Sequence, residues 1–305
     1  MAKILITGGA GFIPSSLADK ILMDKENTVV AVDNLITGDL SKVPLNDRCK
    51  FIKCDVNKYN DIAPIMTSYQ FDYVFHYAAL VGVKRTLDNP VMVLEDIQGI
   101  KNVLDLCKST GVKRVFYSSS SEVYGEPVEL PQHEHTTPLN SRLPYAIVKN
   151  VGEAFCRSYQ QEFGLEYTIF RFFNTYGPKQ STDFVMSKFL KLALNNEDIT
   201  VYGAGDQTRT FCYIDDNLDA CLTAMNDNKF VNDVVNIGND ELITIFELAK
   251  KIIDITDSKS KIIHLPALKE GDMTRRQPDL TNMKMLLNRN MLPIEEGIRR
   301  ILTTK

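Results

Sequence analysis

The run Gly8-Gly-Ala-Gly-Phe-Ile-Pro14 decides the fold of this 305-residue chain. An apolar stretch at 3–7 precedes it with the composition of a buried strand, and an amphipathic helical pattern at 12–25 follows it. A glycine-rich turn between a strand and a helix directs backbone N–H groups, with the positive end of the helix dipole, toward a phosphate. In that context the run predicts a dinucleotide site at the edge of a parallel sheet.

Short apolar runs continue to alternate with helical patterns as far as residue 175. Continuous apolar strands separated by helices are typical of a parallel sheet that is covered on both faces. Right-handed crossovers then make the fold a doubly wound, Rossmann-type α/β structure. Further strands are predicted at 28–33, 51–54, 73–76, 113–118 and 167–172, and long helices at 91–109 and 145–163.

The pattern changes beyond residue 175, where loops lengthen and strands shorten. We therefore predict a dinucleotide-binding domain over 1–175, which includes the helix at 145–163, and a smaller α/β substrate lobe over 176–305. The pattern also allows the chain to cross back to the first domain. In the lobe we expect strands at 200–202 and 234–237 and helices at 184–194, 216–225, 245–255 and 294–301.

Composition and charge describe an ordinary cytoplasmic globular protein. Hydrophobic residues make up 44% and charged residues 24%, and the net charge is −4. The mixed charges leave no basic surface for nucleic acid or a membrane. The first residues lead straight into a strand, so no secretion signal is expected. Six scattered cysteines and four histidines show no metal-ligand spacing, so we expect reduced thiols and no metal.

The residues of the glycine-rich run have separable roles. Gly8 permits the tight turn, and Gly11 lets the backbone approach a pyrophosphate. The N–H groups of Phe12 and Ile13 are then available to the phosphates at the helix N-terminus. Pro14 stands where the usual pattern has a third glycine for helix packing, and proline is tolerated in a first helical turn.

Asp33 selects the cofactor. It ends the second predicted strand, 22 residues after Gly11, with Asn34 beside it. A carboxylate in this place accepts hydrogen bonds from the adenosine ribose hydroxyls and repels a 2′-phosphate, which favours NAD over NADP.

Tyr145 and Lys149 form the catalytic candidate, in the run Leu143-Pro-Tyr-Ala-Ile-Val-Lys149. A secondary alcohol that gives up a hydride must also lose a proton, and a free tyrosine, which titrates near ~10, is a poor base at neutral pH. Lys149 lies one helical turn after Tyr145, so both side chains share a face. Its ammonium favours the phenolate form of Tyr145, and it is expected to hold the nicotinamide ribose as well.

With these motifs in place, the chain resembles the extended short-chain dehydrogenase/reductase family, in its group of nucleotide-sugar epimerases, dehydratases and decarboxylases. The matching segments lie in family order, with a weaker echo at 275–279. They are Thr7-Gly-Gly-Ala-Gly-Phe-Ile, Val32-Asp-Asn-Leu, Cys54-Asp-Val, Phe75-His-Tyr-Ala-Ala79, Ser118-Ser-Ser-Ser-Glu-Val-Tyr-Gly125, Tyr145-x-x-x-Lys149, Arg171-Phe-Phe-Asn-Thr-Tyr-Gly-Pro178 and Thr208-Arg-Thr-Phe-Cys-Tyr-Ile-Asp-Asp216.

The resemblance implies roles for further residues. Ser120 would hydrogen-bond the substrate oxygen beside Tyr145, while Ser118 and Ser119 are expected to satisfy backbone groups at the strand end. Glu122 joins the catalytic set. The remaining candidates are Asp55 and Val56 at adenine, Ala78 and Ala79 where the cofactor passes, and Asn174, Arg209 and Arg276 at the diphosphate of a nucleotide sugar. A specificity loop is expected around 267–276.

The resemblance also implies a reaction that begins with oxidation of a sugar carbon, usually C4, to a ketone. A 4-epimerase needs only a base, NAD and room for the keto sugar to turn, and we place it first. Ser121-Glu122 resembles UDP-glucuronate decarboxylases, which come next, ahead of a 4-dehydrogenase. A 4,6-dehydratase generally carries Asp-Glu at this point and comes last. The alternative outside enzymology is an NAD-binding regulator or scaffold, which an intact Ser120, Tyr145 and Lys149 disfavours.

Two other features follow from the resemblance. The family often has asparagine where this chain has Asp96, so a charge stands in the helix that supports the active site. Family members commonly pair through two long helices, here 91–109 and 145–163, and both carry enough apolar residues for a core face and a shared face. A homodimer is therefore expected, with a tetramer left open.

Overall fold

The structure is a computed structural model that describes residues 1–266 and 275–303, so most of the expected specificity loop lies outside the described residues. The chain divides into two compact units. The first comprises Met1–Val123, Ser141–Arg171 and Cys221–Val235, and the second comprises Tyr124–Asn140, Phe172–Ala220 and Asn236–Lys305. The chain thus passes between the units several times.

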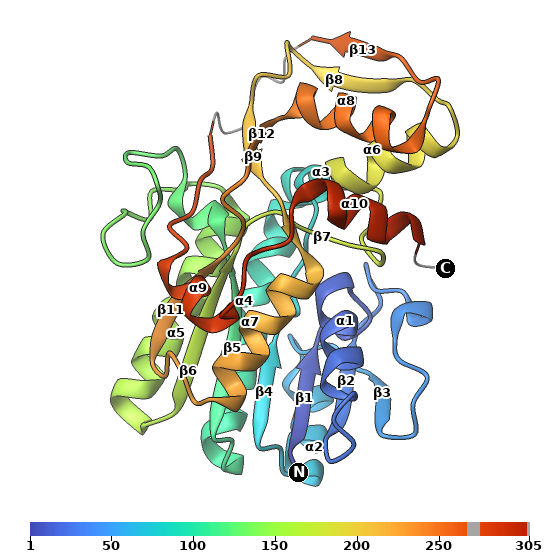
Figure 1. Cartoon of the computed structure of the whole chain (residues 1–305). Coiled ribbons are helices and arrows are strands. Elements are labelled where there is room, and N and C mark those ends of the chain that lie inside the picture. The colour runs from blue at the N-terminus through green and yellow to red at the C-terminus, as the bar shows by residue number, and fades with distance from the viewer. Residues whose placement is uncertain (267–274, 304–305) are drawn as a thin grey trace. The chain divides into compact units, whose positions relative to one another are not determined.

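The first unit is built on a seven-stranded sheet with the strand order β11-β6-β5-β4-β1-β2-β3 (Figure 1). The pairs β1–β2, β2–β3, β1–β4 and β4–β5 are parallel, which confirms the Rossmann-type α/β prediction. The strands are β1 (Lys3–Thr7), β2 (Thr28–Asp33), β3 (Cys49–Lys53), β4 (Tyr73–His76), β5 (Arg114–Ser120), β6 (Glu166–Phe172) and β11 (Asp233–Ile237).

Helices cover both faces of this sheet. On one face α2 (Tyr59–Tyr69), α4 (Pro90–Thr110) and α5 (Pro144–Phe163) enclose the main apolar core. Figure 1 shows α4 and α5 beside the sheet, and they pack closely on each other. On the other face α1 (Phe12–Ile21) packs on β1 and β2, and the rings of Phe75, Phe116 and Phe170 stack across β4, β5 and β6. α3 (Val83–Asp88) packs against α4.

The ends of the helices follow their capping residues. Gly111 and Gly164, with φ of +77° and +73°, end α4 and α5 in the left-handed conformation that glycine adopts freely. The predicted helix at 12–25 is wrong at its end, because α1 stops at Ile21. Met23 is exposed, and Asp24 Oδ1 accepts a hydrogen bond from the Glu26 amide, so a turn replaces the last helical turn.

The second unit consists of helices with short two-stranded sheets. β10 (Cys212–Tyr213) pairs with β7 (Thr175–Tyr176), β12 (Leu242–Thr244) with β9 (Thr208–Thr210), and β13 (Ile262–Leu265) with β8 (Ile199–Tyr202). A capping box between Thr244 and Glu247 starts α8. The helices are α6 (Val185–Leu194), α7 (Ile214–Asn226), which continues into the first unit, α8 (Ile245–Thr256), α9 (Thr281–Leu287) and α10 (Ile294–Thr303).

The structure also shows the state of the cysteines and the character of the helices. All six cysteines are free thiols, and all but Cys49 are buried. Among the described residues, no helix combines the length and the apolar character that crossing a membrane requires.

Candidate active site

The candidate residues of the first unit gather at one edge of the sheet. Because neighbouring parallel strands point the same way, their carboxyl ends meet. Thr7 at the end of β1 lies beside Val32 of β2 and His76 of β4, and His76 lies beside Tyr117 of β5. The glycine-rich turn, Asp33, Ala78 and the serines of β5 therefore share this edge.

The glycine-rich turn forms a cradle of the kind that a pyrophosphate needs. Gly8 has a φ of +71°, and a Cβ there would come within 2.9 Å of Ala78 Cα. Gly11 is the N-cap of α1 and donates its amide to the Gly8 carbonyl at 2.8 Å. No described side chain caps the amides that begin α1, so Phe12 and Ile13 present theirs at the helix N-terminus. Pro14 is buried within the first turn of α1 and leaves the helix intact.

Asp33 lies at this turn with both carboxylate oxygens engaged. Oδ2 accepts the Ala10 amide at 3.1 Å, and Oδ1 accepts the Leu35 amide at 2.7 Å. The carboxylate also lies so close to Gly38 that a Cβ at that position would be only 2.6 Å from Oδ1. Two of its lone-pair positions remain for ribose hydroxyls, so the site fits the adenosine half of NAD. Asn34 follows and accepts the Ile36 amide.

Thr7 and His76 join the two loops that follow β1 and β4. Thr7 Oγ1 accepts the amides of Tyr77 and Ala78, each at 3.0 Å, and contacts His76 Nδ1 at 2.9 Å. Since that oxygen already accepts two hydrogen bonds, its own proton goes to Nδ1, which assigns the tautomer of His76 with the proton on Nε2. Burial, with the nearby charge of Lys149, lowers the pKa of His76 to about 3, so the ring is neutral.

Tyr145 and Lys149 share one face of α5, as their spacing predicts. Lys149 Nζ lies 5.7 Å from the centre of the Tyr145 ring. It donates to the Ser118 carbonyl at 2.7 Å and to Ser118 Oγ at 3.2 Å. Only 3% of the residue is exposed, and this burial lowers the pKa of the lysine to about 8. The ammonium is thereby fixed at the carboxyl end of β5.

The serine cluster separates into distinct environments. Ser118 donates to the His76 carbonyl at 3.4 Å, as expected of a residue that satisfies the strand end. Ser119 does not, because its hydroxyl donates instead to Glu153 at 2.6 Å. Ser120 Oγ accepts the Glu122 amide at 3.2 Å, at the start of the single turn η2 (Ser121–Tyr124). Ser120 and Glu122 thus belong to one short structural unit.

The adenine-side candidates follow the neighbouring strands. Asp55 comes after β3, and its Oδ1 accepts the Asn57 amide at 3.1 Å. Val56 is buried in the main core and is therefore in part a packing residue. Ala78 and Ala79 come after β4, and the backbone of Ala78 approaches Gly8 so closely that Gly8 has no space for a side chain.

The substrate candidates come together within the second unit. Thr208 pairs with Arg275, so Arg209 and Arg276 extend from neighbouring backbone, and both are buried. Asn174 has a left-handed φ of +37° and donates to the Thr210 carbonyl at 3.0 Å, next to Arg209. Two buried arginines on neighbouring backbone have the charge and the planar donors that suit a diphosphate.

The second unit also contains a cluster of side chains with metal-ligand atoms. His133, Glu134 and Asp279 bring ligand atoms within 4.8 Å of one another. Glu134 Oε1 already accepts the Asn236 amide at 2.9 Å, and we assign no metal to the group.

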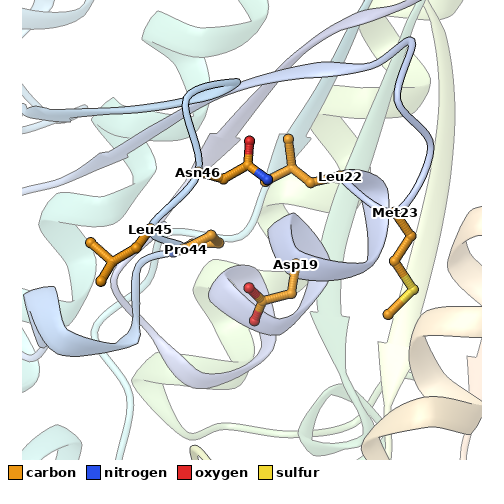
Figure 2. A pocket seen from close by; sticks show the side chains of 6 residues that line it. All are labelled: Asp19, Leu22, Met23, Pro44, Leu45 and Asn46. Carbon is orange, nitrogen blue, oxygen red and sulfur yellow. The ribbon is translucent and has the colours of Figure 1, made fainter.

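A hollow lies at the end of α1 opposite the glycine-rich turn, away from the candidate residues described above (Figure 2). Its lining residues are Asp19, Leu22, Met23, Pro44, Leu45 and Asn46.

The glycine-rich turn suits the pyrophosphate of a dinucleotide, and the buried Lys149, one turn after Tyr145, suits its nicotinamide ribose. Both features lie on the same edge of the sheet, so one bound dinucleotide could use them together. Together with the doubly wound sheet, they define an NAD-dependent oxidoreductase of the short-chain dehydrogenase/reductase type.

Within that class, the chain belongs to the NAD dependent epimerase/dehydratase family, whose sequence profile matches residues 4–238. It is 36% identical over 309 residues to UDP-glucuronic acid decarboxylase 1 of Danio rerio, a match that covers 98% of this chain and 71% of the relative. It is 33% identical to a putative UDP-glucose 4-epimerase of Methanocaldococcus jannaschii, with 98% and 96% covered. The solved UDP-glucose 4-epimerase of Thermotoga maritima, with UDP-glucose, superposes with a TM-score of 0.91 at 32% identity, covering 97% and 96%. NAD dependence and a nucleotide-sugar enzyme are thereby confirmed.

Sequence reasoning did not find the buried charge cluster beneath the active site. Glu153 accepts Arg171 Nε at 2.8 Å and Nη2 at 2.7 Å, and it also accepts Ser119 Oγ. The one available signal was the position of Glu153, four residues after Lys149 on the same face of the helix. Its partner in β6 becomes evident only once the strand and the helix are packed.

Proposed function

We propose that this chain oxidises C4 of a UDP-linked hexuronate and then releases its carboxyl group as carbon dioxide, giving a UDP-pentose. The observation that carries this proposal is the single turn η2, in which the backbone amide of Glu122 donates to the hydroxyl of Ser120, so that a residue with a carboxyl group follows the catalytic candidate by two positions. The UDP-glucuronic acid decarboxylase relative supports the choice of substrate.

The first step requires three side chains of the first unit. Tyr145, as the phenolate, takes the proton of the C4 hydroxyl, and Ser120 hydrogen-bonds the same oxygen. Lys149 stabilises the phenolate and binds the nicotinamide ribose, and its bonds to Ser118 fix its position. NAD, when bound, accepts the hydride that leaves C4. Arg209, Arg276 and Asn174 hold the diphosphate.

The second step explains the presence of Glu122. The 4-ketone makes the sugar a β-keto acid, so the bond between C5 and C6 breaks and its electron pair moves into the C4 carbonyl as an enolate. Carbon dioxide leaves, and C5 must then gain a proton before the ketone is reduced. We assign delivery of that proton, directly or through water, to the carboxyl group of Glu122. Inversion at C4 needs no such group.

A 4-epimerase remains the second candidate, and it is the outcome that we placed first from sequence. The extensive likeness to a solved UDP-glucose 4-epimerase supports it. Release of the 4-keto sugar requires the same first step and an outside oxidant for the cofactor. Dehydration is disfavoured, because Ser121 stands where an acid is expected and is itself buried.

Product analysis by NMR tests these outcomes. With UDP-glucuronate and NAD we expect a UDP-pentose and carbon dioxide, and Glu122→Gln is expected to lower pentose formation about a hundredfold. Absorbance of the reduced nicotinamide should still rise in the variant, since oxidation at C4 precedes the role of Glu122. Glu126→Gln, on the exposed side of the same loop, is the matched control. A C4-inverted hexuronate as product would overturn the proposal in favour of the epimerase, whereas pentose formation that survives in Glu122→Gln would overturn the role proposed for Glu122.

We also propose that the protein is a homodimer formed through α4 and α5. These helices pack together and still expose apolar side chains, namely Val91, Met92, Leu94, Ile147 and Phe163. Such a face is suited to a second copy of itself. Light scattering on the purified protein should give twice the 34.5 kDa of the chain. A mass of one chain contradicts the dimer, and four chains would indicate the tetramer.

A further inference from the structure

Glu153 follows Lys149 by one turn on the same helix, but its carboxylate is engaged by Arg171. The lysine ammonium donates to the carbonyl and hydroxyl of Ser118 and lies 5.2 Å from the centre of the Tyr117 ring. These contacts are dipolar, and burial favours the neutral amine. Among the described carboxylates, the one that raises the pKa of Lys149 is Asp96, on the neighbouring helix α4.

Asp96 is fixed at the same edge of the sheet. Its Oδ2 accepts the amide of Leu80 at 2.8 Å, just beyond the end of β4, and its Oδ1 accepts Asn57 Nδ2 at 3.3 Å. Lys149 is held at the end of β5, the next strand, where Ser118 Oγ donates to the His76 carbonyl. The carboxylate and the ammonium therefore lie over the ends of adjacent strands, between the packed helices α4 and α5.

We propose that Asp96 is a positioning residue that acts through Lys149: its carboxylate keeps the buried lysine an ammonium ion at neutral pH. This inference deepens the proposed function, because that chemistry requires a cationic Lys149 beside Tyr145. The family often has asparagine at this position, which would keep the hydrogen bonds and supply no charge.

The other described ionisable groups around the pair do not replace Asp96. From β4, His76 is neutral because burial lowers its pKa to about 3. From β5, Tyr117 stays protonated because burial raises its pKa far above its ordinary value. From α5, Tyr145 is the group that the lysine serves.

The carboxylate of Asp96 is itself balanced by its surroundings. Burial raises its pKa, and the anion at Asp55 acts in the same direction. The Leu80 amide, Asn57 and Lys149 act the other way and favour the ionised form. Lys149 is therefore part of what keeps Asp96 charged, and the two groups support each other's ionisation.

Asp96→Asn tests the charge with little change in shape. Asn57 Oδ1 is buried and accepts no hydrogen bond from the described residues. If the side-chain amide of Asn57 turns over, its Oδ1 can accept a hydrogen bond from the new NH₂ group at position 96. The remaining side-chain oxygen at position 96 can still accept the Leu80 N–H. Asp105→Asn is the matched control, since Asp105 lies on the same helix but pairs with Lys101 and Lys108.

The measurement is the side-chain ¹³C shift of Lys149 against pH, in lysine-labelled protein without substrate or cofactor. Lys149→Arg assigns the signal. We expect a midpoint near 8 in the unmodified chain and in Asp105→Asn. In Asp96→Asn the midpoint should fall, so that the ratio of ammonium to amine at pH 8 drops at least about threefold.

An unchanged midpoint in a folded Asp96→Asn protein would overturn the proposal. If that variant does not fold, Asp96→Ser applies the same test with a smaller side chain. Asp96→Glu keeps the charge and should restore most of the lost protonation, which a purely structural role of Asp96 does not predict. Because the titration needs no turnover, it stands or falls separately from the decarboxylase proposal.

Discussion

Tyr145→Phe is expected to slow the proposed oxidation at C4 by about a thousandfold, because it removes the phenol oxygen that we propose as the acceptor of the hydroxyl proton. The ring of Tyr145 is partly buried against the main core, and phenylalanine preserves that packing. NAD affinity should change little, since the cradle at Gly8 and Asp33 lies on other strands. The rate is measured as formation of the UDP-sugar product by NMR, and the affinity by calorimetry.

Tyr159→Phe is the matched control for this prediction. It removes a hydroxyl from the same helix, where Tyr159 Oη donates to Asp105 at 2.8 Å rather than facing the active-site edge. The control should retain activity within a few fold. If Tyr145→Phe keeps a comparable rate, Tyr145 is not the base. If both variants fail together, the loss comes from the helix and not from proton transfer.

The cofactor edge was predictable because its signals are local. Gly8 and Gly11 stand within one turn, and a strand and a helix flank them, so composition alone indicates the phosphate cradle. The role of Asp33 was predictable from its distance to the glycine-rich turn, which equals the length of one strand–helix–strand unit. Tyr145 and Lys149 need only the pitch of a helix to share a face. Each inference spans few residues and depends on backbone geometry that glycine or helix spacing imposes.

The contacts that hold these residues in place were not predictable, because they join distant segments. Ser119 lies 34 residues from Glu153, and its role changes from satisfying the backbone to binding a buried carboxylate. Asn236 donates to Glu134 across 102 residues and so ties the segment Tyr124–Asn140 to the second unit. A linear pattern of apolar residues carries no information on such pairs, since many registers satisfy it equally well.

Removal of one partner from the buried pair of Glu153 and Arg171 should strongly destabilise the first unit. Only 0% and 1% of these side chains is exposed, and two parallel hydrogen bonds of 2.8 and 2.7 Å join them. Arg171→Leu leaves the Glu153 carboxylate buried without its main partner, which should destabilise the protein by about 3–5 kcal/mol. Urea unfolding followed by circular dichroism measures the loss. Arg157→Leu is the control, because that arginine is 44% exposed and contacts the same carboxylate, so its loss should cost under about 1 kcal/mol.

The dependence of this stability on pH has a definite sign. Although burial acts to raise the pKa of Glu153, the hydrogen bonds and charge of Arg171 outweigh it and hold that pKa below its usual value of 4.5. The folded state therefore binds its proton less readily than the unfolded chain, so the pair stabilises above the unfolded pKa and loses its effect as pH falls through the folded one. In Arg171→Leu the pKa of Glu153 should rise instead, so stability should increase on mild acidification where the unmodified chain weakens. Glu153→Gln combined with Arg171→Met removes both charges and should recover most of the lost stability. If the double variant is as unstable as Arg171→Leu, packing and not the unpaired charge causes the loss.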